Sequence, residues 1–220
     1  MMNVLAFTSS PRPNANSTAL LQSFENGVQT AGGSMEIVDA QHCTLKPCRG
    51  CLRCNLIKRC ALKNDDWPVL SEKIVAADVL VFAGPIYFHH VAAPLKILID
   101  RFRSFMQIRL TEQGLVHTPW HDWNKQFVLL LTMGAPSNED ARPVVELFEY
   151  ITGVLGPANR LSVVSATGLA LAGQIQMSAE LLSQTYEKLG LDPNRSEGDY
   201  ARNQGFLDKA QELGRSIVPV

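Results

Sequence analysis

Four of the five cysteines in the 220-residue chain lie within one short stretch. Their spacing is Cys-x2-Cys-x2-Cys-x5-Cys, and they are Cys48, Cys51, Cys54 and Cys60. Thiols two residues apart can converge on one point, because a short irregular segment can curl around a single centre, and Gly50 permits the bend. Thiolate sulfur is a soft ligand that selects iron–sulfur clusters, zinc or copper(I). The stretch therefore predicts a metal site.

The spacing favours one kind of metal site over the others. A set of four cysteines is typical of a [4Fe–4S] cluster. Zinc also accepts four thiolates, but its usual sites pair two separated Cys-x2-Cys knuckles, whereas this run is compact. A loop that holds no metal, or a disulfide, is the remaining alternative. Five residues separate Cys54 from Cys60 and Ala61 follows, so the run is not that of a two-cluster ferredoxin, which has three residues and then proline.

Composition limits the class of protein. The chain has 20 basic and 21 acidic residues, a net charge of -1, and is 46% hydrophobic. A protein that binds nucleic acid or an anionic membrane would carry a basic excess, so neither partner is expected. No apolar run reaches the roughly 18 residues that a spanning helix needs, and the first eight residues lack the basic start of a signal peptide. We therefore expect a cytoplasmic protein, in which thiols stay reduced and available for metal or redox chemistry.

Apolar runs that alternate with helical patterns predict a parallel sheet. The expected strands are 3–8, 35–38, 78–83, 126–132 and 160–165, and the expected helices are 18–29, 67–76, 94–102, 139–155 and most of 166–217. Asn16 or Ser17 is expected to cap the first helix. Continuously apolar strands are typical of a parallel sheet covered on both faces. We expect one domain, residues 1–220, with a cysteine-rich loop at about 40–66 and an irregular, aromatic insert at about 105–124.

Three loops follow the carboxyl ends of these strands, where doubly wound sheets bind ligands. Residues 8–18 are rich in hydroxyls and amides, include Arg12 and lead into a helix, whose N-terminus suits a terminal phosphate. They lack the glycines of the Walker and dinucleotide motifs, and an ordinary capped turn is the alternative. Residues 84–90 offer backbone amides and an aromatic pair to a planar heterocycle, with a packed turn as the alternative. Residues 132–136 offer amides beside a glycine to a ring edge.

Taken together, these motifs resemble those of the NAD(P)H-dependent FMN reductases of the flavodoxin-like fold, and within them the iron–sulfur flavoproteins. The motifs are Ser9-Ser10-Pro11-Arg12 with Asn16-Ser17-Thr18, the cysteine run from Pro47 to Cys60 with Asp65-Asp66, Gly84-Pro85-Ile86-Tyr87-Phe88, and Leu95-Lys96-x3-Asp100-Arg101. The resemblance spans about residues 3–166. It implies an α/β, flavodoxin-like, doubly wound five-stranded parallel sheet in the order 2-1-3-4-5, with helices on both faces.

The resemblance also implies cofactors and partners. It implies FMN with its phosphate on the first loop and its isoalloxazine against the other two, and electron transfer between FMN and a [4Fe–4S] cluster held by the four cysteines. The donor would be NAD(P)H as a diffusing substrate or a ferredoxin-type carrier, and the acceptor a small molecule or a protein. The assembly would be a homodimer or homotetramer. The implied flavin contacts are Ser9, Ser10, Arg12, Asn16, Ser17, Thr18, Pro85, Ile86, Tyr87, Phe88, Thr132, Met133 and Gly134.

Several other polar residues are weaker candidates. His89 or His90, which follow the second loop, could donate a proton or a hydrogen bond to reduced flavin; an interface or surface role is the alternative. A proline lies between His117 and His121, so a metal pair on one helix is not expected. Arg101, together with Lys96, is expected in ion pairs at a subunit interface.

Three functions are compatible with these observations. The first is an FMN oxidoreductase in which the cluster passes single electrons. The second is a flavin-only NAD(P)H-dependent quinone or nitro-compound reductase with vestigial cysteines. The third is a non-enzymatic flavin electron carrier or redox sensor.

Overall fold

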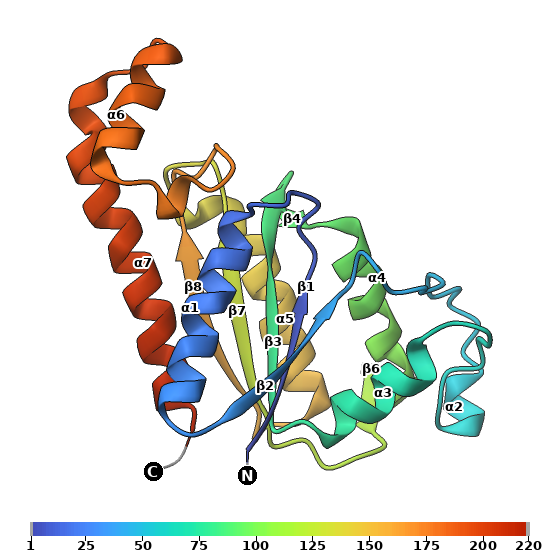
Figure 1. Ribbon diagram of the computed structural model, residues 1–220. Helices are drawn as coiled ribbons and strands as arrows, with labels where there is room; N and C mark the ends of the chain where they lie inside the picture. The colour runs from blue at the N-terminus through green and yellow to red at the C-terminus, as the bar shows by residue number, and fades with distance from the viewer. Residues whose placement is uncertain (1, 219–220) are drawn as a thin grey trace.

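A five-stranded parallel sheet forms the centre of the molecule (Figure 1). The computed structural model describes residues 2–218; Met1 and residues 219–220, which the expected domain includes, lie outside the described residues. The strand order β2-β1-β3-β7-β8 confirms the predicted flavodoxin-like order 2-1-3-4-5, because β7 and β8 are the fourth and fifth parallel strands along the chain. The parallel strands are β1 Asn3–Thr8, β2 Ser34–Asp39, β3 Val79–Tyr87, β7 Gln126–Thr132 and β8 Arg160–Ala166.

Helices cover both faces of the sheet, with α1 and α7 on one face and α3, α4 and α5 on the other (Figure 1). Successive side chains of a strand point to opposite faces, and here both sets are apolar. Leu5 and Phe7 therefore pack against one helix layer, while Val4 and Ala6 pack against the other. The helices are α1 Asn16–Thr30, α2 Cys54–Ile57, α3 Trp67–Ala76, α4 Ala93–Arg101, α5 Arg142–Leu155, α6 Ala179–Lys188 and α7 Ser196–Ser216. Four 3₁₀ turns are η1 Phe102–Phe105, η2 Asn138–Ala141, η3 Gln174–Gln176 and η4 Pro193–Arg195.

The structure corrects three sequence expectations. The strand expected to stop at Gly84-Pro85 continues to Tyr87 and turns back into β4 His90–Val91. The insert expected to be irregular is an antiparallel hairpin of β5 Met106–Thr111 and β6 Gly114–Pro119. Helix α1 begins at Asn16 after Ala15, so neither Asn16 nor Ser17 is its cap. Within residues 2–218, no helix combines the length and apolar character needed to cross a membrane.

Two glycines allow α1 and α7 to touch along their backbones. A Cβ on Gly27 of α1 would lie 2.0 Å from the carbonyl oxygen of Gln211 in α7. A Cβ on Gly214 of α7 would lie 2.1 Å from the carbonyl oxygen of Phe24 in α1. Both distances are far inside van der Waals contact with backbone atoms, which cannot rotate away. The close approach holds α7 against α1, whose other end reaches the candidate site.

We therefore expect Gly214→Ala to destabilise the protein by roughly 2 kcal/mol or more, because the helices must separate to admit a methyl group. Gly205 lies in the same helix, and a Cβ there meets nothing within 4 Å. Gly205→Ala is thus a matched control that should stabilise by about 0.5–1 kcal/mol through helix propensity. Urea denaturation of both variants measures the difference, and equal effects would show that the two helices are not in backbone contact.

Candidate functional site

A crevice of ≈ 190 Å³ lies at the carboxyl ends of β1, β3 and β7, where the three predicted loops meet. Ten of the thirteen expected flavin contacts line it: Ser10, Arg12, Asn16, Ser17, Pro85, Ile86, Tyr87, Thr132, Met133 and Gly134. Ser9 is buried and does not line the crevice, and Thr18 and Phe88 also lie outside the lining. The sheet topology thus gathers residues from three separate parts of the chain at one edge.

Two buried hydroxyl groups, one in the loop after β1 and one in the first turn of α1, have no partner among the described residues. The Oγ atoms of Ser9 and Ser17 are both buried, and neither makes a hydrogen bond within residues 2–218. An unpaired buried hydroxyl is unfavourable by about 1–3 kcal/mol, so such groups normally have a partner. The first turn of α1 also holds no acidic side chain. Free helix N–H groups, unpaired hydroxyls and Arg12 nearby form a site suited to a phosphate.

Gly84 permits β3 to approach the loop after β1 closely. A Cβ at this position would lie 2.7 Å from Ser9 Oγ. The position does not require a left-handed backbone, so the glycine serves the approach and not a turn. Any larger residue would displace Ser9.

A fourth loop forms the remaining wall of the crevice, and the sequence analysis missed it. Leu169 and Ala170 line the crevice from the segment after β8. Asn16 fixes this segment: its Nδ2 donates to the Leu171 oxygen at 2.8 Å, and its Oδ1 accepts from the Ile175 N–H at 3.0 Å. Arg12 Nη1 adds a bond to the Ala170 oxygen at 3.3 Å. The Asn16 side chain therefore positions the wall of the crevice and is already paired.

The second predicted loop is a tight hairpin at the rim of the crevice. Phe88 and His89 have φ values of 50° and 61°, and Tyr87 pairs with His90 across the two-residue turn. Neighbouring left-handed non-glycine residues are strained and are found mainly at functional sites. The Phe88 side chain is fully exposed, whereas Tyr87 reaches the crevice lining.

The two histidine candidates sit on this hairpin but outside the crevice lining. Burial lowers the pKa of His90, and the nearby Lys96 lowers it further, so His90 is neutral near pH 7. Its Nδ1 accepts a hydrogen bond from the Val91 N–H at 3.0 Å. His89 lies 3.7 Å from a carboxylate oxygen of Asp140. A neutral imidazole with one nitrogen already accepting a bond is a poor proton donor, so His90 is the weaker candidate of the two.

The four cysteines of the run line one cavity, distinct from the crevice, together with Arg101 and Arg103. Cys54 is buried, Cys60 is partly buried, and Cys48 and Cys51 are exposed. Two cationic groups contact the two less exposed thiols. Arg101 Nη2 lies 3.3 Å from Cys60 Sγ, and Arg103 Nη1 lies 3.5 Å from Cys54 Sγ. Within residues 2–218, no three His, Cys, Asp or Glu side chains are gathered closely enough to hold a metal ion.

The chemistry of this donor set nonetheless fits a cluster bound by thiolates. All four thiols are free and share one cavity, and guanidinium groups that donate to sulfur stabilise the thiolate form. Burial raises the pKa of the Cys54 thiol, and Arg103 opposes that rise. Cys48 and Cys51 lie on a segment without helix or strand, so the four thiols must come closer together to complete a ligand set.

A buried ion pair anchors the cysteine run to α4. Arg101 Nη1 donates to Asp65 Oδ2 at 2.6 Å and to the Lys46 oxygen at 2.8 Å, and neither charged side chain is exposed. The guanidinium also stacks over Trp67, 5.1 Å from the ring centre. Arg101 is therefore paired inside its own chain, and the expectation that it forms an ion pair at a subunit interface was wrong. Lys96 pairs with Asp100 on the surface of the same helix.

Comparison with known proteins identifies the family of this chain. The family model described as NADPH-dependent FMN reductase matches residues 2–168. The chain belongs to the NADPH-dependent FMN reductase family. This membership confirms the predicted family and makes the chain an FMN-dependent NAD(P)H oxidoreductase by class. Helices α6 and α7 lie beyond the residues that match the family model.

The chain is similar to proteins named iron–sulfur flavoprotein. One from Archaeoglobus fulgidus is 37% identical over 192 residues, which are 87% of this chain and 89% of that protein. One from Methanocaldococcus jannaschii is 34% identical over 102 residues, 46% of this chain and 52% of that protein, so the match spans about half of that relative. Among solved structures, an azoreductase from Bacillus anthracis has a TM-score of 0.66 at 18% identity, and the match covers 98% of this chain and 100% of that chain. This last likeness is one of fold.

Proposed function

We propose that the protein is an oxidoreductase that binds FMN in the crevice and takes electrons from NAD(P)H. The observation that carries the proposal is that the buried hydroxyls of Ser9, in the loop after β1, and of Ser17, in the first turn of α1, have no hydrogen-bond partner within residues 2–218. When bound, FMN accepts a hydride and releases electrons singly or in pairs. Ser17, Arg12 and the free N–H groups of α1 would hold its phosphate, which carries about two negative charges.

The remaining residues would orient and shield the ring. The enclosed crevice, ≈ 190 Å³, is smaller than usual small-molecule sites of roughly 300–1,000 Å³, so the ring would lie toward the open rim. Tyr87 there offers a flat surface, and the backbone around Thr132 and Gly134 offers amides to the ring edge. Met133, buried, packs beneath them. A nicotinamide would approach from the solvent side as a diffusing substrate.

Substitution of Ser17 tests the phosphate site. Ser17→Ala removes one hydroxyl donor to a charged group, a loss of about 1.5–3 kcal/mol, so the Kd for FMN should rise roughly 10- to 100-fold. Quenching of flavin fluorescence during titration of the apoprotein measures this Kd. Ser34→Ala, an exposed serine on the edge strand β2, should leave the Kd unchanged. Equal affinity of all three proteins would place the phosphate elsewhere.

We further propose that Cys48, Cys51, Cys54 and Cys60 hold a [4Fe–4S] cluster that exchanges single electrons with the flavin. The compact spacing, the shared cavity and the arginine contacts to sulfur support it. Two relatives that bear the name iron–sulfur flavoprotein support it as well. Arg101 and Arg103 would stabilise the thiolate charge around such a group.

A flavin-only NAD(P)H:quinone or nitro reductase is the second candidate. It is favoured by the absence of a gathered metal-ligand set within residues 2–218 and by the exposure of Cys48 and Cys51. A non-enzymatic electron carrier would bind the same cofactors but show no steady turnover with nicotinamide. Iron and sulfide analysis of protein purified without oxygen separates the first candidate from the second.

The proposal also covers the compartment in which the protein works, its oligomeric state and its electron donor. Free thiols support a reducing compartment such as the cytoplasm. The exposed Phe88 at the rim of the crevice supports a homodimer or homotetramer that brings a second copy near the flavin. A ferredoxin-type donor remains an alternative to NAD(P)H.

A further inference from the structure

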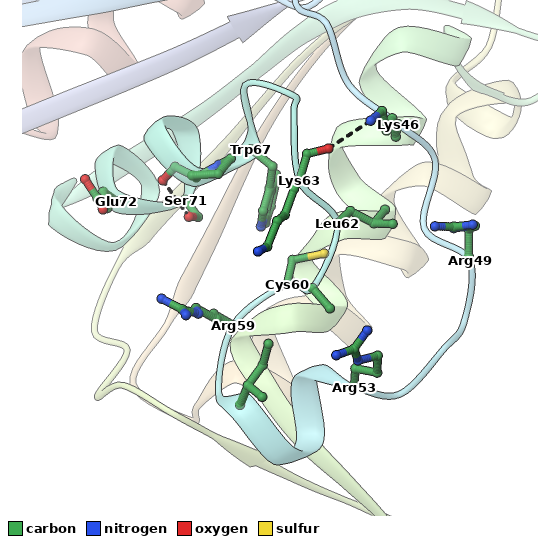
Figure 2. A pocket seen from close by; sticks show the side chains of 13 residues that line it. Lys46, Arg49, Arg53, Arg59, Cys60, Leu62, Lys63, Trp67, Ser71 and Glu72 are labelled. Atoms are coloured by element: carbon green, nitrogen blue, oxygen red, sulfur yellow. Dashed lines mark hydrogen bonds between the residues drawn. The ribbon is translucent and has the colours of Figure 1, made fainter.

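A second cavity, separate from the crevice proposed to hold FMN, is larger than that crevice. It measures ≈ 900 Å³ and lies between the cysteine run and the start of α3 (Figure 2). Five cationic side chains line it, and we call it the basic pocket: Lys46, Arg49, Arg53, Arg59 and Lys63. No part of the proposed flavin reaction uses these residues.

The charge of this segment is unusual for the chain. Residues 40–64 hold six of the 20 lysines and arginines and none of the 21 acidic residues. The rest of the chain therefore has 14 basic against 21 acidic residues. This segment thus carries a local surplus of positive charge in an otherwise acidic chain, and such a surplus attracts anions.

The positive charge in the basic pocket is not neutralised by neighbouring acids. Among residues 2–218, none of its five cations forms an ion pair with a carboxylate. Glu72 is the one acidic side chain in the lining. The two nearest acids in sequence are engaged elsewhere, since Asp65 binds Arg101 and Asp66 accepts from the Thr44 N–H.

A bound cluster would not account for this surplus. Four thiolates around a [4Fe–4S] core leave a net charge of about −2. Arg101 and Arg103 already contact the thiols from the protein side. Three guanidinium groups, those of Arg49, Arg53 and Arg59, stay exposed around the opening (Figure 2).

The rest of the lining indicates the kind of anion. Ile57, Leu62 and Pro68 contribute apolar surface to the same cavity. Its size lies within the roughly 300–1,000 Å³ of small-molecule sites, and its concave form suits a compact ligand better than the flat face of a protein. Arginine recognises carboxylate and phosphate groups through paired N–H donors.

We infer that the basic pocket binds a small organic dianion, with carboxylate or phosphate charge on an apolar body. Arg53 and Arg59 bind the anionic groups, and Ile57 and Leu62 contact the apolar part of the ligand. Because Cys60 also lines the basic pocket, the ligand lies beside the cysteine cavity. This inference goes beyond the proposed function and does not depend on it, since it concerns binding alone.

Isothermal titration of the FMN-loaded protein tests the inference with three probes: naphthalene dicarboxylate, naphthyl phosphate and the singly charged naphthoate. We expect one site per chain. The dianion that binds more tightly should have a Kd at least about tenfold lower than that of naphthoate. The ranking of dicarboxylate and phosphate then identifies the anionic group. Absence of saturable binding by both dianions would overturn the inference.

Matched variants locate the site. The double variant R53Q/R59Q should weaken dianion binding about tenfold or more, because each exposed guanidinium supplies charge-assisted hydrogen bonds. K188Q/K209Q removes the same charge from exposed positions on α6 and α7 and should change binding less than about twofold. Equal effects of the two variants would overturn the inference. The inference would also be overturned if the protein bound polyglutamate but neither dianion, and if R53Q/R59Q abolished the polyglutamate binding. The surface would then be a docking site for a macromolecule.

Discussion

With Cys48 and Cys51 both replaced by alanine, bound iron should fall from about four atoms per chain to fewer than one, while FMN is retained. Both thiols are exposed, so their removal leaves the core intact. A cubane cluster with two of four ligands missing is not held, because the remaining thiols cannot satisfy four irons. The flavin crevice shares no lining residue with the cysteine cavity, so FMN binding should be unchanged. Iron, sulfide and flavin analyses of anaerobically purified protein measure both effects.

Cys43 provides the control for this experiment. It is the fifth cysteine, lies outside the cavity of the other four, and its Sγ contacts the Asp39 oxygen at 3.4 Å. Burial raises the pKa of this thiol, and the carboxylates of Asp66 and Asp39 raise it further, so it is a poor metal ligand. Cys43→Ala should keep the full iron content. An unmodified protein that binds FMN but contains no iron would favour the flavin-only reductase.

Arg101→Met should destabilise the protein by about 3–5 kcal/mol, the usual cost of leaving one half of a buried ion pair unpaired. The variant loses the bonds from Arg101 to Asp65 and to the Lys46 oxygen, and the stacking on Trp67. It should therefore also loosen the attachment of the cysteine run to α4. Urea denaturation of the apoprotein measures the stability, so that cofactor loss does not contribute.

Lys96→Gln is the matched control, because Lys96 pairs with Asp100 in the same helix but in solvent. Exposed pairs contribute about 0–1 kcal/mol, so this change should be small. The double variant R101M/D65L, which removes both charges, should be more stable than Arg101→Met alone. Similar stability losses for Arg101→Met and Lys96→Gln would contradict the burial of the pair.

The pH dependence of stability should reflect the same pair. Burial raises the pKa of Asp65, but the hydrogen bonds from Arg101 and the Lys46 N–H outweigh it, so the native pKa lies below its ordinary value. A lowered native pKa contributes stability that is complete above the unfolded value of about 3.9 and is lost as the pH falls through the native value. The native protein should therefore lose stability more steeply below about pH 4 than Arg101→Met does, as urea midpoints across this range would show.

The central strands were predictable because burial on both faces leaves a continuous apolar run. The sequence analysis predicted β1 and β7 with their observed bounds, and the alternation of apolar runs with helices predicted that the strands are parallel. The extension of β3 past Pro85 was missed, because proline usually ends a strand. Beyond Ala83 the neighbour β1 has ended, so no partner on that side needs the N–H that proline lacks.

Other features depend on contacts that no local pattern shows. The β5 strand does carry alternating apolar and polar residues before Gly114, which is a hairpin signal that the sequence analysis missed. The side chain of Asn16 was expected on the phosphate but holds a segment more than 150 residues away. The crevice wall at Leu169 could have been found, since it follows the fifth strand at the same sheet edge.

The visible spectrum of the FMN-loaded protein, recorded without oxygen before and after adding NADH or NADPH, tests the central claim most directly. We expect the absorbance band of bound flavin to fade within the mixing time after NADH or NADPH is added, and to return when a quinone is added. A chain that retains no flavin, or a bound flavin that dithionite bleaches while both nicotinamides leave it unchanged, would contradict it.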